Sequence, residues 1–153
     1  MNGFQMKWSI EGTKELSRVL RGLESTLTDY SYPFTQSANY LTGYFSRDVF
    51  DSQGAALGKR WKRLSPYTVA QKARSGFPTA PLVRTGNMRS GFRSIVSTGQ
   101  AVIYNTADYF KYHQSRQPRA HLPRRVMMKL SGNLKEQIVK YFQEHIRLSL
   151  VSP

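Results

Sequence analysis

The stretch FRSIVSTGQAVIYNTA, residues 92–107, decides the fold class of this chain. Two runs rich in β-branched and aromatic residues flank Thr98-Gly99-Gln100, and this arrangement is typical of a β-hairpin. Because helical patterns lie on both sides of the hairpin, the chain is predicted to have an α+β fold.

Two further segments carry the two-residue period of a strand. From residue 4 to residue 11, apolar and polar side chains alternate, which indicates a half-buried strand. In RRVMMKL, residues 124–130, Val126, Met128 and Leu130 fall on one face. We therefore predict an antiparallel sheet of about four strands.

Three longer segments place apolar residues at helical spacing. The first begins at Thr13, and the second begins near Pro33 and runs to about Phe50. The last follows Asn133 and Glu136, which have the spacing of a capping box. The apolar positions are Leu16, Val19, Leu20 and Leu23; Phe34, Ala38, Leu41, Phe45 and Val49; and Leu134, Ile138, Tyr141, Phe142, His145 and Ile146. The sheet is thus expected to pack against two N-terminal helices and one C-terminal helix.

Shorter elements are expected between these. Ser65-Pro66 is a cap followed by a first-turn proline, so SPYTVAQKAR predicts a short helix over 65–74. DYFKYHQ, residues 108–114, predicts one or two helical turns.

The segment PLVRTGNMRSGF, residues 81–92, resembles a phosphate-binding loop only superficially, because it lacks the GxxxxGK[ST] pattern. Thr85 or Asn87 is expected to cap a short helix there, and Gly86 allows a tight backbone turn. The apolar side chains expected to point into the core are Leu82, Val83, Met88 and Phe92. We interpret the segment as a corner between a short helix and the hairpin.

Length and composition limit the classes of protein. The 153 residues fit a single domain spanning 1–153, with a modest core. No apolar run approaches the roughly 18–20 residues of a membrane span, and the N-terminus lacks the apolar core of a signal peptide, so we expect a protein made and used in the cytosol. The absence of cysteine excludes disulfides, thiol catalysis and thiolate metal sites.

The net charge of +14 lies entirely in the middle of the chain. Residues 52–130 hold 15 Lys and Arg residues against one acidic residue, Asp108, whereas the flanking segments hold 8 basic and 8 acidic residues. Such an excess of like charge is expected to face an anionic partner, either nucleic acid or an acidic protein surface.

Catalytic and metal-binding patterns are lacking in the sequence. The histidines His113, His121 and His145 show no ligand spacing, and eight of the nine carboxylates lie in the flanking segments. We therefore predict that the protein is not an enzyme and binds no cofactor or metal, and a nuclease or toxin activity is disfavoured for the same reason.

Two basic loops are the candidate contact regions: an extended loop over 51–64 and a second loop over 115–123. In the first, cations surround Trp61, and Trp61 or Tyr67 could stack on a base. The alternatives are a solvated loop or a loop that docks on a carboxylate-rich protein. The residues predicted to face a partner or DNA are Lys59, Arg60, Trp61, Lys62, Arg63, Arg84, Arg89, Arg116, Arg119, Arg124 and Arg125. The residues expected to organise the loops are Thr85, Gly86, His113 and Gln114.

Several landmarks follow one another along the chain. The first is a Gly-x-x-Trp-x-x-Leu-Ser-x-x-Thr-x-x-x-Lys run, formed here by Gly58, Trp61, Leu64, Ser65, Thr68 and Lys72. LVRTGNM (82–88), the hairpin, YFKYHQ (109–114) and LPRRVMMKLS (122–131) come after it. This order resembles the phage virion morphogenesis family, small head–tail joining or tail completion proteins of tailed bacteriophages. Lys62-Arg63 stand where the family pattern has a proline.

This resemblance implies a non-enzymatic virion protein of the phage neck or tail end, assembled in the host cytoplasm. Its implied partners are copies of itself in a six- or twelve-fold ring, neighbouring neck, connector or tail-tube proteins, and DNA passing through the channel. A basic nucleic-acid-binding module is the alternative, and no membrane partner is expected.

Overall fold

The computed structural model describes residues 4–9, 29–116, 119 and 121–151. Its elements are β1 (Gln5–Ser9), α2 (Ser31–Ser46), α3 (Asp48–Asp51), the 3₁₀ helix η2 (Ala55–Leu57), α4 (Pro66–Arg74), α5 (Asn87–Ser90), β2 (Phe92–Val96), β3 (Gln100–Asn105), α6 (Phe110–Gln114) and α7 (Gly132–Val151). The fold is α+β, as predicted. The helix expected from Thr13 lies outside the described residues.

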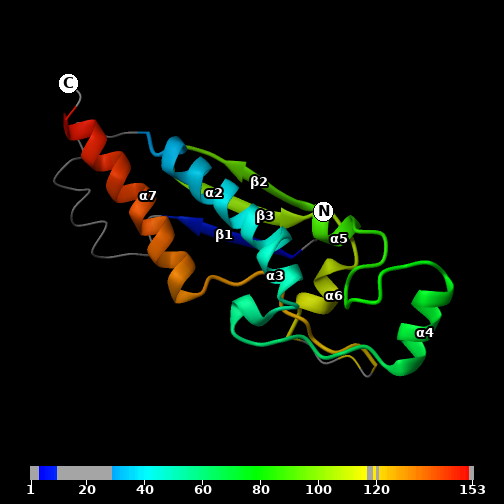
Figure 1. Ribbon diagram of the computed structural model, residues 1–153. Coiled ribbons are helices and arrows are strands. Elements are labelled where there is room, and N and C mark those ends of the chain that lie inside the picture. The colour runs from blue at the N-terminus through cyan, green and yellow to red at the C-terminus, as the bar shows by residue number, and fades with distance from the viewer. Residues whose placement is uncertain (1–3, 10–28, 117–118, 120, 152–153) are drawn as a thin grey trace. The chain divides into compact units, whose positions relative to one another are not determined.

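The sheet has three strands in the order β1-β3-β2 and is antiparallel (Figure 1). β2 and β3 form the predicted hairpin, and the amide of Ser97 donates to the carbonyl of Gln100 at 2.9 Å to close its turn. Along β3, Ala101, Ile103 and Asn105 are buried while the residues between them are half-buried, which gives the strand its inner face.

The fourth strand, expected over 124–130, is absent from the described part of the chain. Met127 and Met128 are both buried, so the side chains of this segment do not alternate between an inner and an outer face. The backbone instead pairs with the side chain of Gln114, whose Oε1 accepts from the amides of Met127 and Met128 at 2.8 and 3.2 Å. A side chain that satisfies the backbone removes the need for a neighbouring strand.

The helix predicted from Pro33 to Phe50 forms as two pieces. It begins at Ser31, whose amide donates to Oδ1 of Asp29 at 2.8 Å, and Pro33 lies in its first turn. The helix α2 ends at Ser46, Arg47 follows, and α3 begins at Asp48. The residues predicted to point inward from these two helices are all fully buried: Phe34, Ala38, Leu41, Phe45 and Val49.

The last helix differs from the prediction at its N-terminus. Asn133 does not cap it, because α7 already begins at Gly132, and the amide of Lys135 donates to the carbonyl of Ser131 at 3.0 Å. The predicted inward stripe is otherwise present: Leu134, Ile138, Phe142 and Ile146 are buried. Tyr141 and His145 are half-buried at its edges.

The contacts of the chain group into two compact units. Unit 1 comprises Met1–Gln5, Thr42–Arg93 and Tyr104–Lys129, and unit 2 comprises Met6–Leu41, Ser94–Ile103 and Leu130–Pro153.

In unit 2, α2 and α7 pack through their aromatic residues. The ring of Phe34 meets that of Phe142 edge-on, with 4.9 Å between the centroids, and Tyr40 meets Tyr141 at 6.0 Å. Burial of large aromatic side chains between two regular helices is the main stabilising term here.

In unit 1, aromatic side chains from different segments form a chain of edge-on contacts. The ring of Phe50 lies 5.2 Å from that of Trp61, and Phe92 lies 5.7 Å from Phe110. Unit 1 also contains two long irregular segments, 75–86 and 123–129. Their backbone groups need partners other than a helix or sheet, and the polar side chains described below supply them.

Candidate interaction surface

The predicted loop over 51–64 is built around two glycines and a buried tryptophan. Gly54 has a φ of 89°, and a Cβ at this position would lie 2.4 Å from Cδ1 of Trp61, so only glycine fits. The 3₁₀ helix η2 follows, and Gly58, with a φ of 96°, ends it. The loop is therefore a fixed turn rather than a fully extended segment.

Trp61 holds this loop to a distant part of the chain. Its side chain is only 4% exposed, and its Nε1 donates to the carbonyl of Val126 at 2.8 Å. This corrects the expectation that Trp61 faces a partner, because a ring buried in this way cannot stack on a base. Tyr67, 78% exposed, is the aromatic residue of this region that is open to solvent.

The two predicted contact regions meet around one cavity of about 750 Å³, which we call the basic hollow. Its cations are Lys59, Arg60 and Lys62 from the first region and Arg116, Arg124 and Lys129 from the second region and the segment after it. All six side chains are exposed. Within the described part of the chain, no carboxylate lines the hollow. Residues more than 50 positions apart in sequence thus contribute cations to one cavity.

Gln114 fixes the wall of the basic hollow. Besides its two bonds to the amides of Met127 and Met128, it donates from Nε2 to the carbonyl of Met128 at 2.6 Å. Its side chain is buried, so these bonds are shielded from competing water. The side chain of Gln114 therefore holds the backbone of Met127 and Met128, which follow the loop over 115–123.

Five of the predicted cations are engaged within the chain. Arg125 is described below, and the guanidinium of Arg84 lies 4.7 Å from the ring centre of Phe77. Arg89 forms an ion pair with Asp51 at 2.7 Å. The guanidinium of Arg119 lies 3.9 Å from the ring centre of Tyr112, and Nε of Arg124 donates to the carbonyl of Gln114 at 3.2 Å. Arg119 and Arg124 remain exposed, so these contacts orient cations that still face solvent.

The segment 81–92 forms the predicted corner before the hairpin, but its short helix is not capped as expected. Gly86 has a φ of 83° and is itself the N-cap of α5, with no side-chain hydrogen bond at that position. The prediction that Thr85 or Asn87 caps the helix is therefore wrong. Met88 and Phe92 are buried, as expected, whereas Leu82 and Val83 are half-buried because they line a second cavity.

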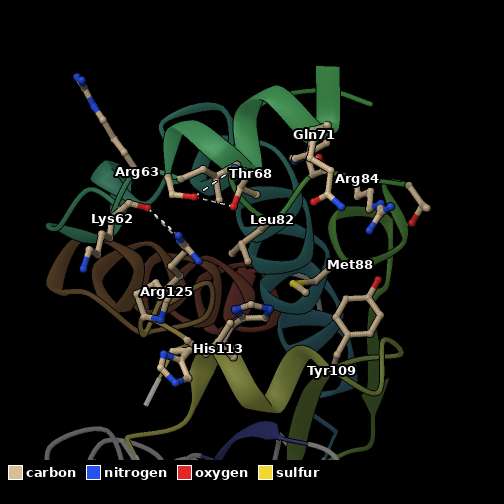
Figure 2. Close-up of a pocket in the computed structure, with 18 of the residues that line it drawn as sticks. Lys62, Arg63, Thr68, Gln71, Leu82, Arg84, Met88, Tyr109, His113 and Arg125 are labelled. Carbon is tan, nitrogen blue, oxygen red and sulfur yellow. Dashed lines mark hydrogen bonds between the residues drawn. The ribbon is translucent and has the colours of Figure 1, made fainter. Parts of the chain in front are cut away.

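This second cavity, the α4 cavity, has a volume of about 670 Å³ and lies beside α4 (Figure 2). The predicted cap of α4 is present: Oγ of Ser65 accepts from the amide of Thr68 at 3.2 Å. The cations that line the cavity are Lys62, Arg63, Lys72, Arg84 and Arg125. No Asp or Glu among the described residues lines it.

Two of these cations are buried and bind backbone carbonyls. Nζ of Lys72 donates to the carbonyls of Ala80 and Val83 at 2.7 and 2.6 Å. Nε and Nη2 of Arg125 donate to the carbonyl of Lys62 at 3.1 and 2.9 Å (Figure 2). Arg125, 5% exposed, is thus not part of the open surface on which it was expected.

The positive charges of the α4 cavity act on one another. Burial lowers the pKa of Lys72, and the nearby charges of Arg84 and Arg125 lower it further. Burial also lowers the pKa of Arg125. For His113, burial and then the charge of Arg125 lower the pKa below its usual range. Its Nδ1 is buried and has no hydrogen-bond partner among the described residues.

Sequence reasoning did not propose Lys72 as a site residue, although Lys72 ends the Gly-x-x-Trp run. The signal was its place in α4 five residues before the proline-rich FPTAP; the bend that follows brings the carbonyls of Ala80 and Val83 to one ammonium group. Lys129 was also missed, although it lines the basic hollow. His121 lines the α4 cavity together with His113.

Other kinds of site were also sought in the described ranges. No group of three or more His, Asp or Glu side chains there could hold a metal ion. None of the helices described is long and apolar enough to cross a membrane.

No protein-family model matches the chain, and searches of curated proteins and of solved structures found no match either.

Proposed function

We propose that the protein is a structural subunit of the neck or tail end of a tailed-phage virion, where copies of it form a ring that completes the tail or joins it to the head. The observation that carries the proposal is the basic hollow, in which six exposed cations from two distant regions meet without a carboxylate among the described lining residues. Such a surface suits contact with an anionic neighbour rather than catalysis.

The order of landmarks gives the proposal its phage context. The landmark residues Trp61, Lys72 and Gln114 are buried, and each bonds to the backbone of another segment. Residues with such roles preserve the shape of a loop surface, and that shape is what a ring subunit must present to its neighbours. The proposal includes virion localisation and the absence of enzymatic activity.

The first experiment measures assembly of the purified chain by light scattering and negative-stain electron microscopy. We expect rings of one stoichiometry. The variant Lys59→Glu/Arg60→Glu should impair assembly while its thermal unfolding stays that of the wild type, because both side chains are exposed. The matched control is Lys135→Glu/Lys140→Glu, which reverses two exposed charges on α7 and should assemble normally.

The second experiment removes the gene from the phage that encodes it. We expect particles in which heads and tails stay unjoined or tails stay incomplete. A protein that remains monomeric, together with deletion particles that still join heads to tails, would overturn the proposal.

A nucleic-acid-binding module is the second candidate, and it is favoured by exposed Tyr67, which lies in the first turn of α4 just after the basic loop over 51–64. It predicts that the monomer binds short duplexes, with a slope of log affinity against log salt of about −0.9 for each phosphate contacted. Duplex binding of this kind without ring formation would favour this candidate over the first.

A further inference from the structure

The α4 cavity contains buried positive charge that the chain itself does not neutralise. Lys72 is 9% exposed and Arg125 is 5% exposed. Within the described residues, the ion pairs are Arg89–Asp51 and Arg147–Glu144, and none of these four side chains lines the cavity. Buried cations are ordinarily paired with an anion, so this cluster is an exception that calls for a ligand.

Each of the two buried cations, Lys72 and Arg125, has an N–H group that makes no hydrogen bond to the described residues. The ammonium of Lys72 has three hydrogens and uses two of them on carbonyls. Arg125 uses Nε and Nη2, and its Nη1 makes no hydrogen bond within the part of the chain that is described. The Arg125 side chain reaches into the α4 cavity between Lys62 and His113 (Figure 2). Two charged donors from different segments are therefore held in place in the lining of one cavity.

The backbone beside these donors is strained. Leu82 has a φ of 60°, in the left-handed region that a leucine rarely adopts. It lies in the bend whose carbonyls, at Ala80 and Val83, hold the ammonium of Lys72. Strain of this kind is concentrated at binding sites, where the surrounding structure maintains it.

We propose that the α4 cavity binds a carboxylate side chain of an acidic peptide segment from another protein, with Lys72 and Arg125 as the charged donors and Arg84 at the exposed rim. A volume of about 670 Å³ is that of a site for a small group or a few side chains. This inference concerns a single subunit and does not depend on ring formation.

The depth of the donors favours a peptide over a nucleic acid. The phosphates of a duplex lie on the outside of a wide rod, so they meet exposed cations such as those of the basic hollow. A carboxylate at the end of a slim side chain can enter a cavity. The lining also includes the apolar residues Leu64, Leu82 and Met88, which can pack against the aliphatic part of such a side chain.

The charge balance favours a different protein over a second copy of this chain. Unit 1 carries 16 basic and 3 acidic residues, and one of those three, Asp51, already pairs with Arg89. A whole second copy has a net charge of +14, so it brings more positive charge than it can neutralise. The partner segment is expected to be rich in Asp or Glu.

The test titrates a fluorescein-labelled hexaglutamate peptide, amidated at its C-terminus, into the full chain and follows fluorescence anisotropy. Lys72→Gln and Arg125→Gln should each weaken binding by about tenfold or more, because each removes a buried charged donor. Arg84→Gln, at the rim, should weaken it by about two- to threefold. Arg74→Gln is the matched control, since Arg74 is an exposed cation on α4 that does not line the cavity, and it should bind as the wild type does.

Two further measurements keep the test decisive. Circular dichroism shows whether Lys72→Gln and Arg125→Gln are folded; if they are not, Arg84→Gln alone decides, because its exposed side chain can be removed without loss of the fold. Amide chemical shifts of the wild type should change around Thr68, Leu82 and Met88 on addition of the peptide.

The proposal is overturned if hexaglutamate does not bind, or if Arg84→Gln and Arg74→Gln weaken binding equally. A duplex of 12 base pairs provides the other arm. If Arg84→Gln weakens binding of the duplex and leaves hexaglutamate unaffected, the cavity is a nucleic-acid site and the peptide proposal is wrong.

Discussion

The two units of this chain differ in charge and in how their segments are held. Unit 1 carries 16 basic and 3 acidic residues, a net charge of +13, whereas unit 2 carries 7 basic and 6 acidic residues, a net charge of +1. The described part of unit 2 consists mainly of regular elements, and the apolar faces of α2 and α7 pack together. Unit 1 contains long irregular segments that are fastened by buried polar side chains.

The difference follows from how the backbone hydrogen bonds of each unit are satisfied. A helix satisfies its own backbone, so α2 and α7 need only bury apolar side chains. In an irregular segment such as 123–131, the backbone groups have no partners in a helix or sheet. The side chains of Trp61 and Gln114 bond to several of them instead. Buried polar side chains therefore hold the irregular segments of a strongly cationic unit in a fixed shape. Three experiments test this contrast.

The largest effect is expected for the core of unit 2. Phe142→Ala should lower the free energy of unfolding by about 3–5 kcal/mol, because it empties the space between α7 and Phe34. Urea denaturation measures the change. Val139→Ala on the same helix is the control, since Val139 is 40% exposed and should cost well under about 1 kcal/mol. Equal costs for the two variants would contradict an apolar core at Phe142.

A smaller but more local effect is expected in unit 1. Gln114→Leu should cost about 2–3 kcal/mol, because it keeps the volume but leaves the amides of Met127 and Met128 and the carbonyl of Met128 without a partner. These two amides should also exchange hydrogen faster, which nuclear magnetic resonance detects. Gln143→Leu, on the exposed side of α7, should leave both stability and exchange as in the wild type.

The smallest effect concerns the pH dependence of stability. The folded protein holds the pKa of His113 below its ordinary value of about 6.5, because of burial and the charge of Arg125. Below pH 6.5 the unfolded chain therefore binds a proton that the folded chain does not, so stability falls as the pH drops through this range toward the folded-state pKa.

His113→Gln should remove this contribution. The wild type should then lose more stability than the variant between pH 7.5 and pH 5.5, as measured by thermal unfolding at each pH. His121→Gln is the control because His121 is exposed. If the wild type and His113→Gln lost the same stability, burial of a neutral His113 would be wrong.

The features that could be predicted from the sequence are those with local signals. The hairpin around Thr98-Gly99-Gln100, the cap at Ser65 and the stripe of α7 each depend on residues within a few positions of one another. Their patterns survive because neighbouring residues already determine the backbone conformation.

The features that were missed depend on contacts across the chain. The alternation in 124–130 suggested a strand, yet the buried amide of Gln114 replaces a neighbouring strand there. Trp61 stands among cations, which suggested exposure, and nothing near it in sequence shows that Val126 accepts its Nε1 proton. Charge patterning did locate the candidate surface, but it could not separate buried Arg125 from exposed Arg124.

The hydrogen bonds that join Trp61 to Val126 and Lys62 to Arg125 can form only late in the synthesis of the chain. These partners are 65 and 63 residues apart, so a ribosome that adds about 5–20 residues per second needs about 3–13 s to make the second after the first. During that interval the cations around Trp61 are synthesised but unfastened. Unit 1 can therefore reach its final shape only after most of the chain has been made, and its most basic loop emerges before the segment that holds it in place.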